Sequence, residues 1–141
     1  MSEPLTILIA EDSPADRLLL STILAREGHR VLTAADGQEA LLRVSEARPD
    51  LVLLDLALPG IDGFAGLDIL RRRYPAMPVA VVSAFDDLPT ITRVLNLGAS
   101  GFIPKAFSGE ALLSAVRQVL AGNIFRPSSQ SAGATLDAET P

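Results

Sequence analysis

The sequence predicts a doubly wound α/β domain built on a five-stranded parallel sheet with the strand order 2-1-3-4-5. Five short aliphatic runs alternate with five stretches that have the apolar spacing of helices. One of these runs, residues 51–54, is apolar throughout, as expected of an interior strand that is covered on both faces. Right-handed crossovers leave few ways to wind five such units into one sheet.

The composition limits both the size and the setting of the protein. The 141 residues suffice for one domain with its own core, and 48% of them are hydrophobic but only 4% aromatic, so the core is aliphatic. Cysteine is absent, which excludes disulfides and thiolate metal sites. The net charge of −5 argues against direct binding of nucleic acid. The sequence shows neither a membrane-spanning run nor a secretory leader, and we expect a cytoplasmic protein.

The first two strand–helix units follow from apolar runs and capping residues. A strand at 5–10 leads into a helix that has Ser13 as its N-cap and Pro14 in its first turn. A second strand covers 29–35 and a second helix covers about 38–48. The side chains expected to face the core are Ala15, Leu18, Leu19, Thr22 and Ile23 in the first helix and Ala40, Leu41, Val44 and Ala47 in the second.

The remaining elements continue the alternation. They are expected as a strand that ends at Asp55, a helix at about 63–74, a strand at 79–82, a helix at about 87–97, a strand at 101–103 and a helix at 109–121. The basic run at 71–73 is interpreted as favourable charge at a helix C-terminus rather than as a nucleic-acid site. From residue 126 the apolar period is lost, so we expect residues 1–125 to form the domain and 126–141 a flexible tail or interdomain linker.

Three carboxylates are expected to converge at one edge of this sheet. Glu11 and Asp12 follow the first strand and Asp55 ends the third, and these strands are neighbours where the strand order reverses. Two charges about 4 Å apart repel by roughly 4 kcal/mol at an effective dielectric near 20, so the cluster needs a counter-charge. Oxygen ligands favour Mg²⁺ or Mn²⁺. Zinc is disfavoured, because cysteine is absent and the single histidine lies at the opposite strand end.

A hydroxyl and an ammonium group join the carboxylates at the same edge. Ser83 ends the fourth strand and Lys105 follows the fifth. The set predicts phosphoryl chemistry, with Asp55 as the nucleophile that forms an acyl phosphate. The cation and Lys105 would neutralise the oxygens of the group in transfer. Each residue alone is typical of a cap or a surface position, but five of them at four strand ends favour a site.

These residues resemble the receiver domain of two-component response regulators, which has a flavodoxin-like (βα)5 fold. The resemblance covers about residues 4–122 and is carried by Glu11-Asp12, Asp55, the run Leu58-Pro-Gly-Ile-Asp-Gly63, Ser83-Ala84 and Pro104-Lys105. It implies a phosphorelay signalling domain in which Asp55 accepts a phosphoryl group from the phosphohistidine of a sensor histidine kinase. Such a domain assists its own phosphorylation and dephosphorylation but is not an enzyme in the usual sense.

The resemblance assigns the metal ligands. It implies that Asp12, Asp55 and the backbone carbonyl of Ala57 bind Mg²⁺ directly and that Glu11 acts through water. Receivers use the position of Ala57 to tune the hydrolysis of the acyl phosphate. Because this side chain is small, we expect water to reach the phosphoryl group rather freely.

The resemblance also assigns a switch. It implies that Ser83 binds a phosphoryl oxygen and that Phe102 is the switch aromatic that turns inward behind it. The Pro104 peptide bond is expected to be cis. Two residues depart from the usual pattern: Phe102 has no hydroxyl, and Ala106 stands where many receivers have a proline.

The stretches at 98–105 and 108–113 resemble the NarL/LuxR-type subgroup of regulators, which carries a helix-turn-helix output domain. No output domain follows within these 141 residues, so we expect either a piece of a longer transcription regulator or a single-domain regulator. The expected partners are a sensor histidine kinase, a second copy of the chain on phosphorylation, and a DNA-binding output domain outside this chain.

Other functions stay open at this point. A Mg²⁺-dependent aspartyl-phosphate phosphohydrolase would need a second carboxylate at position 57, where the chain has alanine. A flavodoxin-like binding module would need a glycine- or hydroxyl-rich phosphate loop after the first strand, where the chain has Glu11-Asp12-Ser13. A receiver-like docking module that takes no phosphate is the third alternative.

Overall fold

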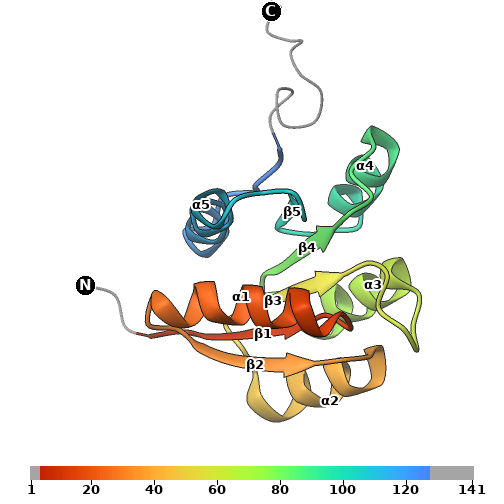
Figure 1. Ribbon diagram of the computed structural model, residues 1–141. Coiled ribbons are helices and arrows are strands. Elements are labelled where there is room, and N and C mark those ends of the chain that lie inside the picture. The colour runs from red at the N-terminus through yellow and green to blue at the C-terminus, as the bar shows by residue number, and fades with distance from the viewer. Residues whose placement is uncertain (1–3, 128–141) are drawn as a thin grey trace, which may run out of the picture.

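The computed structural model describes residues 4–127, which form the predicted parallel sheet in the order β2-β1-β3-β4-β5 (Figure 1). Its elements are β1 (Thr6–Ala10), α1 (Pro14–Arg26), β2 (Arg30–Ala34), α2 (Gly37–Ala47), β3 (Leu51–Asp55), α3 (Gly63–Arg73), β4 (Val79–Ser83), α4 (Leu88–Asn96), β5 (Gly101–Pro104) and α5 (Gly109–Leu120). All ten lie within two residues of their predicted bounds. Most of the predicted tail, 128–141, lies outside the described residues.

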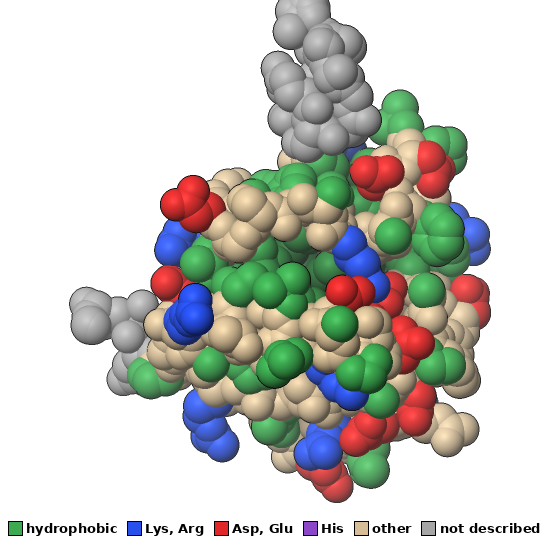
Figure 2. Space-filling view, in the orientation of Figure 1, with side chains coloured by type: hydrophobic (Ala, Val, Ile, Leu, Met, Phe, Trp, Pro, Cys, Tyr) green, Lys and Arg blue, Asp and Glu red, His purple; other side chains and the backbone are tan. Residues whose placement is uncertain are grey.

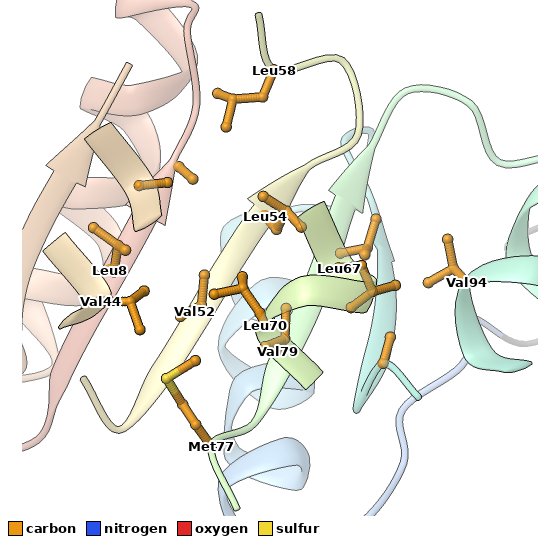
Figure 3. Close-up of a cluster of buried hydrophobic side chains, with 14 of the residues drawn as sticks. Leu8, Val44, Val52, Leu54, Leu58, Leu67, Leu70, Met77, Val79 and Val94 are labelled. Atoms are coloured by element: carbon orange, nitrogen blue, oxygen red, sulfur yellow. The ribbon is translucent and has the colours of Figure 1, made fainter. Parts of the chain in front are cut away.

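Helices cover both faces of the sheet, with α1 and α5 on one side and α2, α3 and α4 on the other (Figure 1). Alternate residues of each strand therefore enter two separate cores. In β3, Leu51 and Leu53 join the cluster under α1 and α5, while Val52 and Leu54 join the cluster under the other three helices (Figure 3). Every residue of β3 is buried, as the continuous apolar run predicts. Each buried leucine stabilises the fold by roughly 1.5–3 kcal/mol.

Side-chain caps fix where the helices begin, and the cap at Ser13 was predicted. The Ser13 hydroxyl accepts a hydrogen bond from the Asp16 amide at 3.3 Å, and Asp36 accepts one from the Glu39 amide at 2.8 Å. Asp87 caps α4 through the Thr90 amide at 3.1 Å. Since caps act within one turn of the chain, they are readable from sequence.

The predicted inward face of α1 is wrong except at Ile23, which packs against the core. Leu18 and Leu19 are 69% and 58% exposed, whereas Leu24 is fully buried and Leu20 and Ile23 pack beside it. The apolar residues of this helix extend around more than one face, so their spacing does not decide which stripe turns inward. In α2 the buried stripe includes Ala40 and Val44 as predicted, but Ala47 is exposed.

The predicted cis peptide bond before Pro104 is also wrong, because this bond is trans. Pro104 is the last residue of β5 and pairs with Ser83, and an extended strand requires a trans peptide. The amide of Phe102, two residues earlier, points away from β4 to the outer edge of the sheet. The missing N–H of Pro104 therefore falls on the edge side and costs no bond to β4.

A short segment after α5 closes this outer edge. The Phe125 amide donates to the Ser100 carbonyl at 2.9 Å, and the Phe102 amide donates to the Phe125 carbonyl at 3.0 Å. The Phe125 ring meets Phe107 edge-to-face, with centroids 5.9 Å apart. Gly101 permits this approach, because a Cβ there would lie 3.1 Å from the Phe125 Cβ.

We predict that Phe125→Ala lowers the free energy of unfolding by about 1–2 kcal/mol, less than a fully buried phenylalanine because the ring is only partly covered. Urea denaturation measures this. The neighbouring Ile124, which is 68% exposed, supplies the control: Ile124→Ala should change stability by less than about 0.5 kcal/mol. Equal effects of the two substitutions would contradict the contact.

Candidate functional site

The carboxyl ends of four strands bring the predicted residues to one edge of the sheet. Ala10 of β1 pairs with Leu54 of β3, so the next residues, Glu11 and Asp55, lie side by side. Ser83 ends β4, and Lys105 directly follows β5. The parallel register of the strands therefore brings these positions together, whatever the conformations of the side chains.

Lys105 lies among three carboxylates. Its ammonium nitrogen is 2.9 Å from Glu11 Oε1, 3.1 Å from Asp55 Oδ2 and 3.2 Å from Asp16 Oδ2. The Glu11 and Asp55 side chains are almost fully buried, while that of Lys105 is 24% exposed. The loop backbone completes the arrangement, because the Ala57 amide donates to Asp55 Oδ1 at 3.0 Å and the Ser13 amide to Glu11 Oε2 at 3.0 Å.

Glu11, Asp12 and Asp55 together form a group of oxygens that fits a metal ion. One oxygen of each lies within 4.8 Å of the others, and Asp12 is exposed to solvent while its two partners are buried. Lys105 supplies a single positive charge to these acids and Asp16. Carboxylate oxygens in excess over cations are the donor set that hard divalent ions such as Mg²⁺ and Mn²⁺ prefer.

Burial and neighbouring charges shift the pKa values of Glu11 and Lys105. Burial, reinforced by the nearby charge of Asp55, raises the pKa of the Glu11 carboxyl against the opposing effect of Lys105. Burial would lower the pKa of Lys105, but its contacts with Glu11, Asp55 and Asp16 outweigh burial and raise it. Lys105 is therefore charged throughout the physiological pH range.

The two residues predicted to form a switch, Ser83 and Phe102, are both buried. The Ser83 side chain is buried, and its hydroxyl accepts a hydrogen bond from the Phe85 amide at 2.9 Å. Its carbonyl accepts one from the Lys105 amide at 3.0 Å, which joins β4 to the lysine-bearing turn. Phe102 is fully buried in the core under α4.

Two residues at the site were missed in the sequence. Asp16 contacts Lys105, and the Arg17 guanidinium donates to the Glu11 carbonyl at 2.8 Å and the Asp12 carbonyl at 3.3 Å. Both lie in the first turn of α1, where an acid is already favoured by the helix dipole. Their position at the start of the helix that follows Glu11-Asp12 could have indicated that they lie near the site.

A cleft of about 280 Å³ opens beside the site, between α1 and α5. Asp16 and Lys105 contribute to its lining together with Leu19, Ile23 and Phe107. Hydrophobic side chains gather in this hollow in the space-filling view (Figure 2). Within residues 4–127, no helix has the length and apolar character needed to cross a membrane.

A family model that describes the response regulator receiver domain matches residues 7–117. The chain belongs to this family. The receiver is 39% identical over 117 residues to the transcriptional regulatory protein AfsQ1 of Streptomyces coelicolor and 40% identical over 121 residues to the transcriptional activator protein ExaE of Pseudomonas putida. These alignments cover 82% and 84% of the receiver but 51% and 56% of the relatives, so the chain spans about half their length.

Solved receivers share the fold. A CheY-like receiver domain protein from Methanospirillum hungatei superposes with a TM-score of 0.80 at 28% identity, over 85% of this chain and 96% of that one. A two-component response regulator of the LuxR family from Aurantimonas gives a TM-score of 0.82 at 27% identity, over 87% and 89%. Regulators named NtrX are also similar, so the matches do not select one subgroup. The predicted family and fold are confirmed.

We predict that Lys105→Met lowers the free energy of unfolding without Mg²⁺ by about 1–3 kcal/mol, because Glu11 and Asp55 lose their counter-charge while buried. The same change should increase the rise in melting temperature on adding Mg²⁺, since no ammonium then repels the ion.

Thermal unfolding with and without Mg²⁺ measures both effects. Arg72→Met removes one positive charge from an exposed pair with Asp68 and serves as the control, with changes below about 0.5 kcal/mol. A Mg²⁺ response of Lys105→Met equal to that of the unsubstituted receiver would argue against a metal site next to the lysine.

Proposed function

We propose that this receiver is phosphorylated on Asp55 and that the phosphoryl group switches its conformation. The observation that carries the proposal is the surroundings of Asp55, which is buried, lies 3.1 Å from Lys105 and shares one oxygen cluster with Glu11 and Asp12. A lone buried carboxylate would be costly, and here a lysine lies beside it at the edge of the sheet where α/β proteins bind ligands.

The transfer is a displacement at phosphorus. An oxygen of Asp55 forms a bond to the phosphorus of a phosphohistidine, the P–N bond breaks, and its electron pair returns to the imidazole nitrogen. Lys105 stabilises the negative charge on the transferring oxygens. Its 3.1 Å contact with Asp55 supports this role.

Asp12, Asp55 and the Ala57 carbonyl would hold Mg²⁺ or Mn²⁺, and Glu11 would act on it through water. When bound, the ion neutralises negative charge among the acids and on the phosphoryl oxygens. The exposure of Asp12 beside two buried acids supports a site that is open to solvent on one side.

The switch would act through Ser83 and Phe102. The phosphoryl group adds nearly two negative charges and three acceptor oxygens, so it can draw the Ser83 hydroxyl from the Phe85 amide. α4 follows this loop, and its Thr90, Ile91, Thr92 and Val94 are weak helix formers. Such a helix is suited to respond to a change in the loop before it.

The proposed partners are a sensor histidine kinase and an output domain. Leu18 and Leu19 are exposed on α1, and Leu19 lines the cleft together with Asp16 and Lys105, so this helix offers apolar contact area to a docking kinase. The relatives AfsQ1 and ExaE are named as transcription regulators. We propose a LuxR-type DNA-binding output domain outside this chain and dimerisation on phosphorylation.

We also propose that the protein acts in the cytoplasm and does not turn over as an enzyme. The receiver domain would occupy residues 1–125, with a linker after it.

Intact mass after incubation with acetyl phosphate and Mg²⁺ tests the phosphoacceptor. We expect one added phosphoryl group, which EDTA prevents and which Asp55→Asn abolishes. A phosphorylated histidine kinase serves as a second donor. If neither donor nor a beryllofluoride mimic produces an adduct, the receiver-like docking module becomes the better account.

A second prediction concerns the lifetime of the phosphoryl group. Ala57 is exposed at the rim of the site, so its small side chain leaves water a path to phosphorus. Ala57→Met should lengthen the half-life of the phosphorylated form, followed by loss of added mass after the donor is removed. Ala65→Met, on the exposed face of α3, is the control. A half-life as long with Ala57 as with methionine would refute the open path.

A further inference from the structure

Asp16 differs from the other two carboxylates that contact Lys105. The side chains of Glu11 and Asp55 are 1% and 4% exposed, whereas that of Asp16 is 44% exposed. Asp16 also comes from a helix rather than from a strand end, and 89 residues separate it from the lysine. Asp16 is therefore the carboxylate on the solvent side of the ammonium group, and we call this side the mouth of the site.

The local structure holds Asp16 in this place. Ser13 caps α1 and accepts a hydrogen bond from the Asp16 amide, which fixes the first helical turn directly after Glu11-Asp12. The Asp16 carboxylate then accepts a hydrogen bond from Lys105 at 3.2 Å. The Lys105 ammonium, which also donates to Asp55 at 3.1 Å, is shared between the acceptor and the mouth of the site.

The charge at the mouth opposes the incoming group. Glu11, Asp16 and Asp55 contact Lys105, and Asp12 lies in one oxygen cluster with Glu11 and Asp55. Among the side chains of the protein itself, these four carboxylates outnumber Lys105 and Arg17. A phosphoryl group brings about two further negative charges. Of the four acids, Asp16 is neither the phosphoryl acceptor nor a member of the metal-ion cluster.

We propose that Asp16 is a positioning residue that binds Lys105 in competition with the phosphoryl oxygens and so restrains phosphorylation by anionic donors. The inference rests on the proposed role of Asp55. With acetyl phosphate, an Asp55 oxygen bonds to phosphorus, the P–O bond to the acetyl group breaks, and acetate leaves with the electron pair. Asp16 takes no part in these bonds and acts through its charge and its hold on the ammonium.

A purely structural role makes a different prediction. An acid in the first turn stabilises a helix through the dipole, and its loss would lower stability without regard to the charge of a donor. The test therefore compares Asp16→Asn, which keeps the shape but not the charge, with Asp16→Glu, which keeps the charge. Asp68→Asn removes one exposed negative charge on α3 and controls for the net charge of the protein.

The measurement is the apparent second-order rate of phosphorylation, by intact mass, with acetyl phosphate and with the less negatively charged phosphoramidate at low and high salt. Asp16→Asn should react about fivefold faster with acetyl phosphate at low salt. The repulsion in water between a unit charge and a dianion about 8 Å apart corresponds to about this ratio of rates. The gain should shrink with phosphoramidate and with salt. Asp16→Glu and Asp68→Asn should react like the unsubstituted receiver.

The outcomes separate the two proposals. If the unsubstituted receiver is phosphorylated but Asp16→Asn is equally fast or slower with both donors, the role of Asp16 is overturned while that of Asp55 stands. A gain that is the same for both donors and at both salt concentrations also overturns it. If no form of the receiver takes a phosphoryl group from either donor, both proposals fail. Thermal unfolding of each variant confirms that the compared proteins are folded.

Discussion

The burial of Asp55 and Glu11 against one ammonium group is the interaction on which the rest of this site depends. Two carboxylates that are almost fully covered by the fold cannot both be ionised without nearby positive charge. Lys105 supplies it at 2.9 and 3.1 Å, and the carboxylates in turn raise its pKa. One lysine does not balance the charge of Glu11, Asp12 and Asp55, and their oxygens are the ligands that a further hard cation would use. The chemistry of the site follows from this deficit.

The parallel sheet brings these residues together through strand pairing, with little need for special loop sequences. β1 and β3 are parallel and in register, so the residues at their carboxyl ends, Glu11 and Asp55, become neighbours at one edge of the sheet. β4 and β5 extend the same edge to Ser83 and Lys105. Because helices cover both faces, the strands can be wholly apolar until they reach the edge. Polar chemistry is thus confined to the ends of the strands.

The features predictable from sequence were those that depend on local patterns or on this topology. The strand order, the cap at Ser13, and the meeting of Glu11, Asp12 and Asp55 belong to this class. The inward face of α1 was not predictable, since its leucines surround the helix and only packing selects Leu24. The contact of Asp16 with Lys105 spans 89 residues, and the closure of the β5 edge depends on a turn after α5. Such contacts are set by tertiary structure.

A chain of contacts links Lys105, at one end of β5, to Phe102, near its other end. Through these contacts a change of charge at Asp55 can affect residues far from the site. Lys105 and Phe107 share one turn, closed by the bond from the Phe107 amide to the Pro104 carbonyl at 3.1 Å. Phe107 packs on Phe125, whose carbonyl binds the Phe102 amide. If phosphorylation moves the ammonium as proposed, the movement would act on the same contacts that hold the chain after α5. Couplings of about 1–3 kcal/mol are typical of such linked sites. The packing of the partly buried Phe125 ring is of similar size, so the proposed switch would be strong enough to affect the segment after α5.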